Sequence, residues 1–293
     1  MLSASGSIDV QKVRSHDGLT ACELAAPPVP ARLRAHVRSW LGYSEAGAPA
    51  RRRELPGPSV VVILDLGSPL RVTESGDATR WLRHAGGFVA GLDDGPSLTE
   101  HDGRHAGIQL SLTPSAARAL FGVRLGTIAR RVIALSDALP RSRSLSERLA
   151  NAPSWAERFA IVEADLFGRA PDAARTSAAA SWATGQIERT GGRIEIGALA
   201  SELGYSRKHL AAIFDEHVGL TPKLYASLVR FDRVVDRLKT APGQRWTDLA
   251  LSHGYADQAH LAREVRRFAG VTPTSVKASL AVEHPLFASP APA

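Results

Sequence analysis

The stretch GYSRKHLAAIFDEHVGLTP (204–222) is followed, 50 residues further on, by a related one, GYADQAHLAREVRRFAGVTP (254–273). Each stretch begins with Gly-Tyr and ends with Gly, one apolar residue and Thr-Pro. Apolar residues at helical spacing predict an amphipathic helix just before each Gly-Tyr, over 196–203 and 246–252. The glycine suits the left-handed backbone of a tight turn between two helices. The sequence therefore predicts one helix-turn-helix unit that occurs twice.

The second helix of each unit is expected to begin at a capping residue, Ser206 in the first copy and Asp257 in the second. Each of these helices has an apolar inward face. The inward residues are Leu210, Ile213, Phe214 and His217 in the first copy, and Leu261, Val265 and Phe268 in the second. Such a face packs a helix onto its partner and leaves the opposite face free.

The outward faces combine small side chains with long hydrogen-bond donors. Small residues let a helix lie deep in the major groove of DNA, where Lys, Gln and Arg reach the edges of bases. We therefore predict DNA contacts from both second helices and their caps. The predicted residues are Ser206, Arg207, Lys208, Ala211, Ala212, Asp257, Gln258, Ala259, Ala262, Arg263 and Arg266.

One long helix is predicted to connect the two units. Pro222 suits a first helical turn, and apolar residues recur at spacings of three and four through 222–240. A helix of this length spans about 28 Å, which is close to the ~34 Å of one turn of duplex DNA. The two second helices are thus expected to enter successive segments of the major groove from one face of the DNA.

Residues 191–280 resemble the C-terminal domain of the AraC/XylS family of bacterial transcription regulators. The resemblance rests on the paired pattern and on residues within and around it. These are Leu199-Ala200, Gly204-Tyr205-Ser206, Leu210, Phe214, Gly219, Thr221-Pro222, Tyr225, Arg230, Leu249-Ala250, Gly254-Tyr255, Asp257-Gln258, Arg263, Gly270 and Thr272-Pro273. The family's closing Tyr-Arg is replaced by Val276-Lys277, and Leu261 and Val265 replace aromatic residues. The resemblance implies a sequence-specific regulator of transcription with two DNA-reading helices.

The first half of the chain reads as short strands followed by helices. Strands are predicted over 59–66, 87–91 and 106–112, where apolar and β-branched residues lie between turn residues. Helical spacing begins after Pro114, and 154–167 starts with Ser154 as a cap and Glu157 three residues later. These strand positions are similar to the cupin-like β-barrels of the family's N-terminal domains, which implies a small-molecule effector without identifying any pocket residue.

We therefore predict an α+β chain. A β-rich, barrel-like sensor or dimerisation domain is expected over 1–170, and an all-α DNA-binding domain with two helix-turn-helix units over 173–280. The Pro- and Ala-rich tail, 281–293, is expected to be disordered. Apart from double-stranded DNA and the effector, RNA polymerase and a second copy of the chain are candidate partners. The operator, the effector and the direction of regulation do not follow from the sequence.

Composition excludes several other classes of protein. Apolar residues make up 44% of the 293, as in an average globular protein, and the single cysteine, Cys22, cannot form an internal disulfide. With no apolar run long enough to span a membrane and no signal peptide, a cytoplasmic protein is expected. The net charge of +7 fits DNA binding. However, 31 of the 36 basic residues are Arg, which also fits codon bias in a GC-rich genome.

A cupin-type metalloenzyme fused to a DNA-binding domain is the alternative interpretation. Its candidate ligands are His84, Glu100, His101 and His105, but the paired His-x-His of such sites is absent and Asp102-Gly103 reads as a turn. We interpret 100–105 as an exposed polar loop. The run Arg51–Arg53 could contact phosphates, but we interpret it as a solvated loop. Without a metal site or a nucleophile motif, no enzyme activity, metal or cofactor is predicted.

Overall fold

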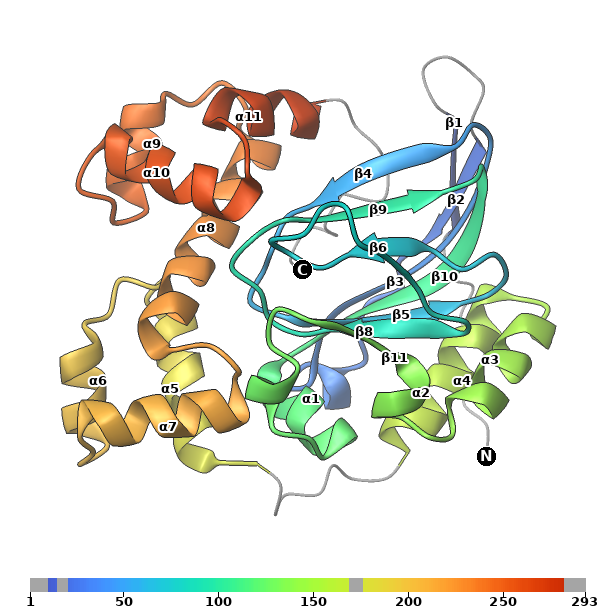
Figure 1. The fold of residues 1–293 in the computed structure, drawn as a ribbon, viewed down its shortest axis with the longest axis horizontal. Helices are drawn as coiled ribbons and strands as arrows, with labels where there is room; N and C mark the ends of the chain where they lie inside the picture. Colours follow the sequence, from blue (N-terminus) through green and yellow to red (C-terminus); the bar gives the residue numbers. More distant parts are fainter. Residues whose placement is uncertain (1–9, 15–20, 169–175, 282–293) are drawn as a thin grey trace.

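The computed structural model describes residues 10–14, 21–168 and 176–281, and the following concerns these residues. The first half forms two β-sheets with helices, and the second half is helical (Figure 1). The predicted α+β class is confirmed. The domain boundary predicted near residue 170 and all but the first residue of the predicted disordered tail lie outside the described residues.

The two sheets are antiparallel throughout and face each other. Their orders are β1-β2-β3-β10-β5-β8-β11 and β4-β9-β6-β7. The strands of the larger sheet are β1 (Val10–Arg14), β2 (Ala21–Ala25), β3 (Val37–Ala46), β5 (Val60–Asp65), β8 (Gly87–Ala90), β10 (Arg104–Leu112) and β11 (Val132–Ala134). Those of the smaller sheet are β4 (Ala50–Glu54), β6 (Arg71–Thr73), β7 (Trp81–Arg83) and β9 (Ser97–His101).

The register of the large sheet places polar side chains between the two sheets. Gly107 on β10 is paired with Tyr43 on β3 and with Asp65 on β5. A Cβ atom on Gly107 would come within 2.6 Å of the Tyr43 hydroxyl, so the absence of a side chain gives the tyrosine its space. His105 is paired with Glu45 in the same register. The interior of the first domain is therefore polar in part.

Helices of the first half cover the outer face of the large sheet. Trp40 on β3 packs against Phe159, with 5.0 Å between ring centroids. Gly42 lets Trp155 lie directly on the strand, since a Cβ atom there would be 2.4 Å from the indole ring. The helices are α1 (Pro114–Phe121), α2 (Leu135–Ala138), α3 (Ser142–Asn151) and α4 (Trp155–Phe167), with short 3₁₀ turns η1 (Ala31–Leu33) and η2 (Leu125–Thr127).

Among the described residues of the second half there are seven helices. They are α5 (Ala178–Arg189), α6 (Ile196–Glu202), α7 (Arg207–His217), α8 (Pro222–Thr240), α9 (Trp246–Ser252), α10 (Gln258–Ala269) and α11 (Pro273–Ala281). Of these, α6 to α10 follow the predicted double unit closely. Residues of both halves belong to one continuous apolar cluster. The two domains are therefore packed on each other.

The predictions that 100–105 and Arg51–Arg53 are exposed loops are both wrong. Residues 100–105 are the end of β9, a turn and the start of β10, and His101 and His105 are only 6% and 3% exposed. The Arg51–Arg53 run lies in β4, where Arg52 is an inward residue paired with Glu45 at 2.5 Å. Both stretches are rich in charge but alternate between the sheet interior and solvent, because strand side chains point to opposite faces in turn.

Candidate nucleic-acid interface

The first helix-turn-helix unit is formed by α6 and α7. Gly204 in the turn has a φ of +68°, the left-handed conformation that favours glycine. The Ser206 hydroxyl accepts a hydrogen bond from the backbone N–H of His209 at 3.1 Å, which confirms it as the N-cap of α7. Leu210 and Phe214 are fully buried against the rest of the domain. The N-terminal turns of α7 are left on the surface.

The second unit, α9 and α10, repeats this construction. Gly254 has a φ of +78°, and the Asp257 carboxylate caps α10 by accepting from the N–H of His260 at 2.6 Å. Leu261, Val265 and Phe268 are buried, as predicted. The apolar face thus again fixes which side of the helix is free.

A tyrosine-histidine contact recurs at the turn of both units, and the sequence reasoning missed it. The ring of Tyr205 meets His209 edge to face at 4.6 Å, and Tyr255 meets His260 at 5.2 Å. In each unit the histidine follows the capping residue by three positions, so comparison of the two copies of the repeat could have revealed the contact. These pairs brace the start of each second helix against its turn.

The residues predicted to contact DNA lie on the free faces of α7 and α10. All of them are exposed except Ala211 and Ala262, which are half-buried. The side chains of Ser206 and Asp257 are occupied as caps, and Arg207 lies close over Gly197 of α6. Within the described chain, Arg263 makes no hydrogen bond or ion pair. Its guanidinium is therefore available to an external partner.

The connecting helix α8 is the core of the second domain as well as a spacer. It carries one aromatic contact to each unit: Tyr225 to Phe214, at 6.2 Å, and Phe231 to Phe268, at 5.0 Å. Arg230 donates to the carbonyl of Gly192 at 2.6 Å and joins α8 to the segment before the first unit. With 19 residues, α8 is about 28 Å long. The separation of the two units is thus set by a packed helix.

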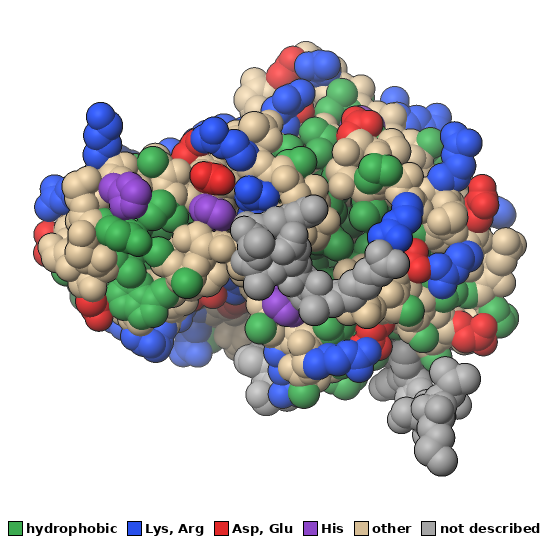
Figure 2. Space-filling model, turned by 90° about the horizontal axis from the view of Figure 1, so that it is seen from below, with side chains coloured by type: hydrophobic (Ala, Val, Ile, Leu, Met, Phe, Trp, Pro, Cys, Tyr) green, Lys and Arg blue, Asp and Glu red, His purple; other side chains and the backbone are tan. Residues whose placement is uncertain are grey.

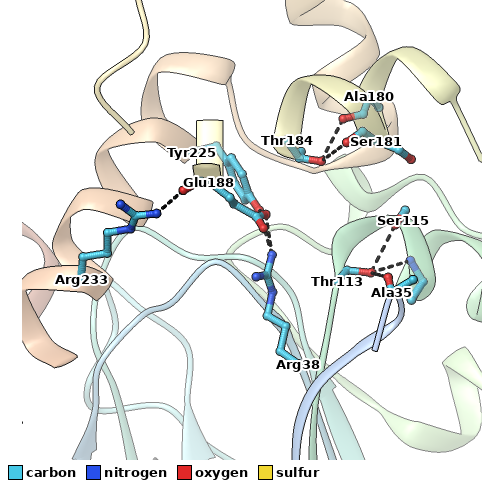
Figure 3. Close-up of polar contacts among 11 residues, drawn as sticks. Ala35, Arg38, Thr113, Ser115, Ala180, Ser181, Thr184, Glu188, Tyr225 and Arg233 are labelled. Carbon is cyan, nitrogen blue, oxygen red and sulfur yellow. Dashed lines mark hydrogen bonds and ion pairs between the residues drawn. The ribbon is translucent and has the colours of Figure 1, made fainter. Parts of the chain in front are cut away.

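The N-terminal domain holds the helical domain through buried and surface contacts. Arg38 on β3 pairs with Glu188 on α5 at 2.5 Å and donates to the Tyr225 hydroxyl at 3.3 Å (Figure 3). Tyr225 donates to the same carboxylate, and Arg233 donates to the backbone carbonyl of Glu188. Burial, above all, raises the pKa of Tyr225 well above its usual value, so it stays a neutral donor.

Further contacts reach the C-terminal ends of both second helices. Arg124 pairs with Asp215 at 3.0 Å, near the end of α7. Arg53 donates to the carbonyl of Ala269 at 3.3 Å, the last residue of α10, and Asp94 pairs with Arg267 at 2.7 Å. The N-terminal domain therefore contacts α7 and α10 at the ends opposite to their free N-terminal turns.

A cavity of about 180 Å³ lies between the two sheets. Its apolar lining includes Val61, Ile63, Val72 and Phe88, and its polar lining includes Tyr43, Arg52, Glu54, Thr99, His105 and Gln109. His105 lies 3.4 Å from the Tyr43 hydroxyl and 3.5 Å from Asp65, whose pKa is raised by burial. Among the described residues, no group of three or more His, Cys, Asp or Glu side chains is arranged to hold a metal ion.

Charge alone does not mark a binding surface. On the face seen in Figure 2, Lys and Arg side chains are scattered over both lobes of the molecule, with acidic side chains between them. The repeated helix geometry therefore marks a candidate interface better than the net charge does.

Asp232 on α8 gives a test of how the domains are docked. It faces Gly57 of the N-terminal domain, and burial, followed by the nearby Asp236, raises its pKa to about 6. Arg38 and Lys239 oppose this shift, and Glu188 adds to it. Because the folded protein prefers the protonated form, the free energy of unfolding falls as pH rises from about 4 to 6.

We expect Asp232→Asn to stabilise the protein at pH 7.5, by about 3 kcal/mol at most, and to make no difference near pH 4. Thermal melts of the variant and the wild type at both pH values measure this. A loss of stability at pH 7.5 that disappears near pH 4 would mean that the carboxylate instead holds the domains together through its charge.

Comparison with known proteins gives matches in the helical domain. Residues 199–279 match a family described as "Helix-turn-helix domain". The chain is 31% identical over 98 residues to a probable transcription factor, PqrA, of Proteus vulgaris, a match that covers 33% of this chain and 77% of that protein.

Solved structures are similar to the chain at lower identity. ToxT of Vibrio cholerae has a TM-score of 0.47 at 10% identity, over 80% of this chain and 98% of that one. A transcriptional regulator of Chromobacterium violaceum, described as an AraC-type DNA-binding domain-containing protein, has a TM-score of 0.33 at 21% identity, over 35% of this chain and 92% of that one.

Proposed function

The chain belongs to the AraC/XylS family of transcription regulators, and we propose that α7 and α10 each read one segment of the major groove of a single duplex. The observation that carries this proposal is the repeated geometry. Two capped helices present exposed small and basic side chains, and a rigid helix about 28 Å long joins their units. A single chain then holds both readers.

Selection from a random duplex library tests the proposal. The full chain should enrich a site with two conserved segments whose centres lie about 10 base pairs apart, one turn of the duplex. Enrichment of one segment only, or of none, would contradict reading by both helices.

We further propose that the cavity between the sheets binds the effector. Its volume of about 180 Å³ is small beside the roughly 300–1,000 Å³ of pockets for drug-sized ligands, so a small molecule is expected. The polar groups around Tyr43 and the apolar wall around Phe88 favour a molecule with one polar and one apolar end. Such an effector can change how the N-terminal domain is docked on the helical domain only if it binds one arrangement of the two domains more tightly than another.

The alternative of a metalloenzyme is not favoured by the site. The two histidines within the sheets are each placed beside a carboxylate, His101 at 3.4 Å from Glu45 and His105 at 3.5 Å from Asp65. We propose a regulator without catalytic activity. RNA polymerase, and a second copy bound through the N-terminal domain, are proposed partners that reading of the duplex does not itself require.

A further inference from the structure

Asp94 links the N-terminal domain to the second reading helix. It lies between β8 and β9, and its carboxylate accepts from Arg130 of the same domain and pairs with Arg267 of α10 at 2.7 Å. Burial tends to raise the pKa of Asp94, but the hydrogen bonds from the two guanidinium groups outweigh it and hold the pKa below its usual value. The carboxylate is therefore charged at neutral pH.

Arg267 lies beside Arg263, at the edge of the α10 face that is proposed to contact DNA. It follows Arg263 by four residues, so the two side chains share one side of the helix. Its side chain is 52% exposed, and Asp94 occupies its guanidinium. A DNA phosphate is an anion of the kind that binds the same guanidinium. The carboxylate and a phosphate therefore compete for Arg267.

We propose that the Asp94–Arg267 pair is an autoinhibitory contact, in which the N-terminal domain withholds from DNA an arginine that binds a phosphate in the complex. This inference rests on the proposed function, because it takes α10 to be a reading helix. Release of Asp94 frees one cation for the duplex and also removes one of the contacts that hold the C-terminal end of α10 to the N-terminal domain.

The contact is placed where the effector cavity can control it. Asp93 and Gly95 both line the cavity, with Asp94 between them, and Pro96 of the same loop lies against Gly270 at the end of α10. Arg131 also lines the cavity and follows Arg130, the second partner of Asp94.

The backbone at this point is strained. Arg130 has a φ of +59°, the one positive φ of a non-glycine residue in the described part of the chain. Such strain is held by surrounding contacts and is common in switch regions. A ligand that moves the loop of Asp93 and Gly95 therefore moves the Asp94 carboxylate as well.

Asp94→Asn tests the contact in the full chain without ligand. On the duplex enriched by selection, we expect its affinity to rise about three- to tenfold and the dependence of log affinity on log salt to steepen by about one unit, since one more phosphate contact is made. Asp102→Asn, in the β9–β10 turn, is the control that changes net charge equally. Arg130→Ala removes the other partner of Asp94 but keeps the Asp94–Arg267 pair. We therefore expect it not to raise the affinity for the duplex.

Arg267→Ala separates the contact from other effects. Its slope of log affinity against log salt should be shallower than that of Asp94→Asn by about one unit. The double variant Asp94→Asn with Arg267→Ala should bind DNA as Arg267→Ala alone does. Circular dichroism verifies folding, and Asp94→Ser replaces Asp94→Asn if the amide is not tolerated. Equal affinity of Asp94→Asn and Asp102→Asn, or a gain that persists without Arg267, would overturn the inference. A wild-type chain that enriches no duplex would instead overturn the proposed function.

Discussion

Replacing Arg263 by Ala should weaken binding to the selected duplex by about 1–3 kcal/mol and relax sequence preference at one base pair. The reason is geometric, because Arg263 is exposed, lies in the N-terminal half of α10 and makes no hydrogen bond or ion pair within the described chain. A guanidinium in that position can donate two hydrogen bonds to one guanine. Titration of duplexes that carry each base at the affected position measures the loss.

Two variants make this result specific. Arg263→Lys keeps the positive charge but cannot donate two hydrogen bonds to one guanine. It should therefore bind all duplexes more tightly than Arg263→Ala does, but without the wild-type preference for one base pair. Arg266→Ala changes a neighbouring exposed arginine, which we expect to contact a phosphate, so it should weaken binding to all sequences alike. If Arg263→Ala also weakened all sequences alike, Arg263 would contact the backbone of DNA and not a base.

Replacing Phe231 by Ala should cost about 3–5 kcal/mol of stability and abolish binding to the selected duplex. Phe231 on α8 is fully buried, and its ring lies 5.0 Å from that of Phe268 on α10. Without it, α10 loses the aromatic contact that fixes its position relative to α7. Urea unfolding measures the stability, and DNA binding well below the unfolding midpoint measures the second effect.

Leu251→Ala is the matched control, because this side chain is an apolar residue of the same domain that is 62% exposed. It should leave both stability and DNA binding near wild type. A Phe231→Ala protein that is destabilised yet still binds the selected duplex with full affinity would show that α8 does not set the placement of the second reader.

The helical domain follows from the sequence because its determinants are local and occur twice. Gly204 and Gly254 mark the turns, Ser206 and Asp257 the caps, and the apolar spacing between them gives the buried faces. The first helix of each unit and the connecting helix are likewise fixed by apolar spacing. Helix α11 lacks such a pattern, and the sequence did not predict it.

The N-terminal domain follows only in part. Strands β5, β8 and β10 are rich in apolar residues, whereas β4 is ARRRE and carries Arg52 into the interior, where Glu45 of β3 neutralises it. A buried charge is stable only beside its partner, and no local pattern reveals a partner on another strand. The same holds for Asp94 and Arg267, which are 173 residues apart in the chain.

Hydroxyl-radical footprinting of the full chain on its selected duplex tests most directly whether one molecule reads DNA with both helices. At a concentration where one chain is bound per duplex, two protected segments should appear on one face of the DNA, about 10 base pairs apart. Arg263→Ala should weaken the protection of one segment only. A single protected segment per bound chain would contradict reading by α7 and α10 together.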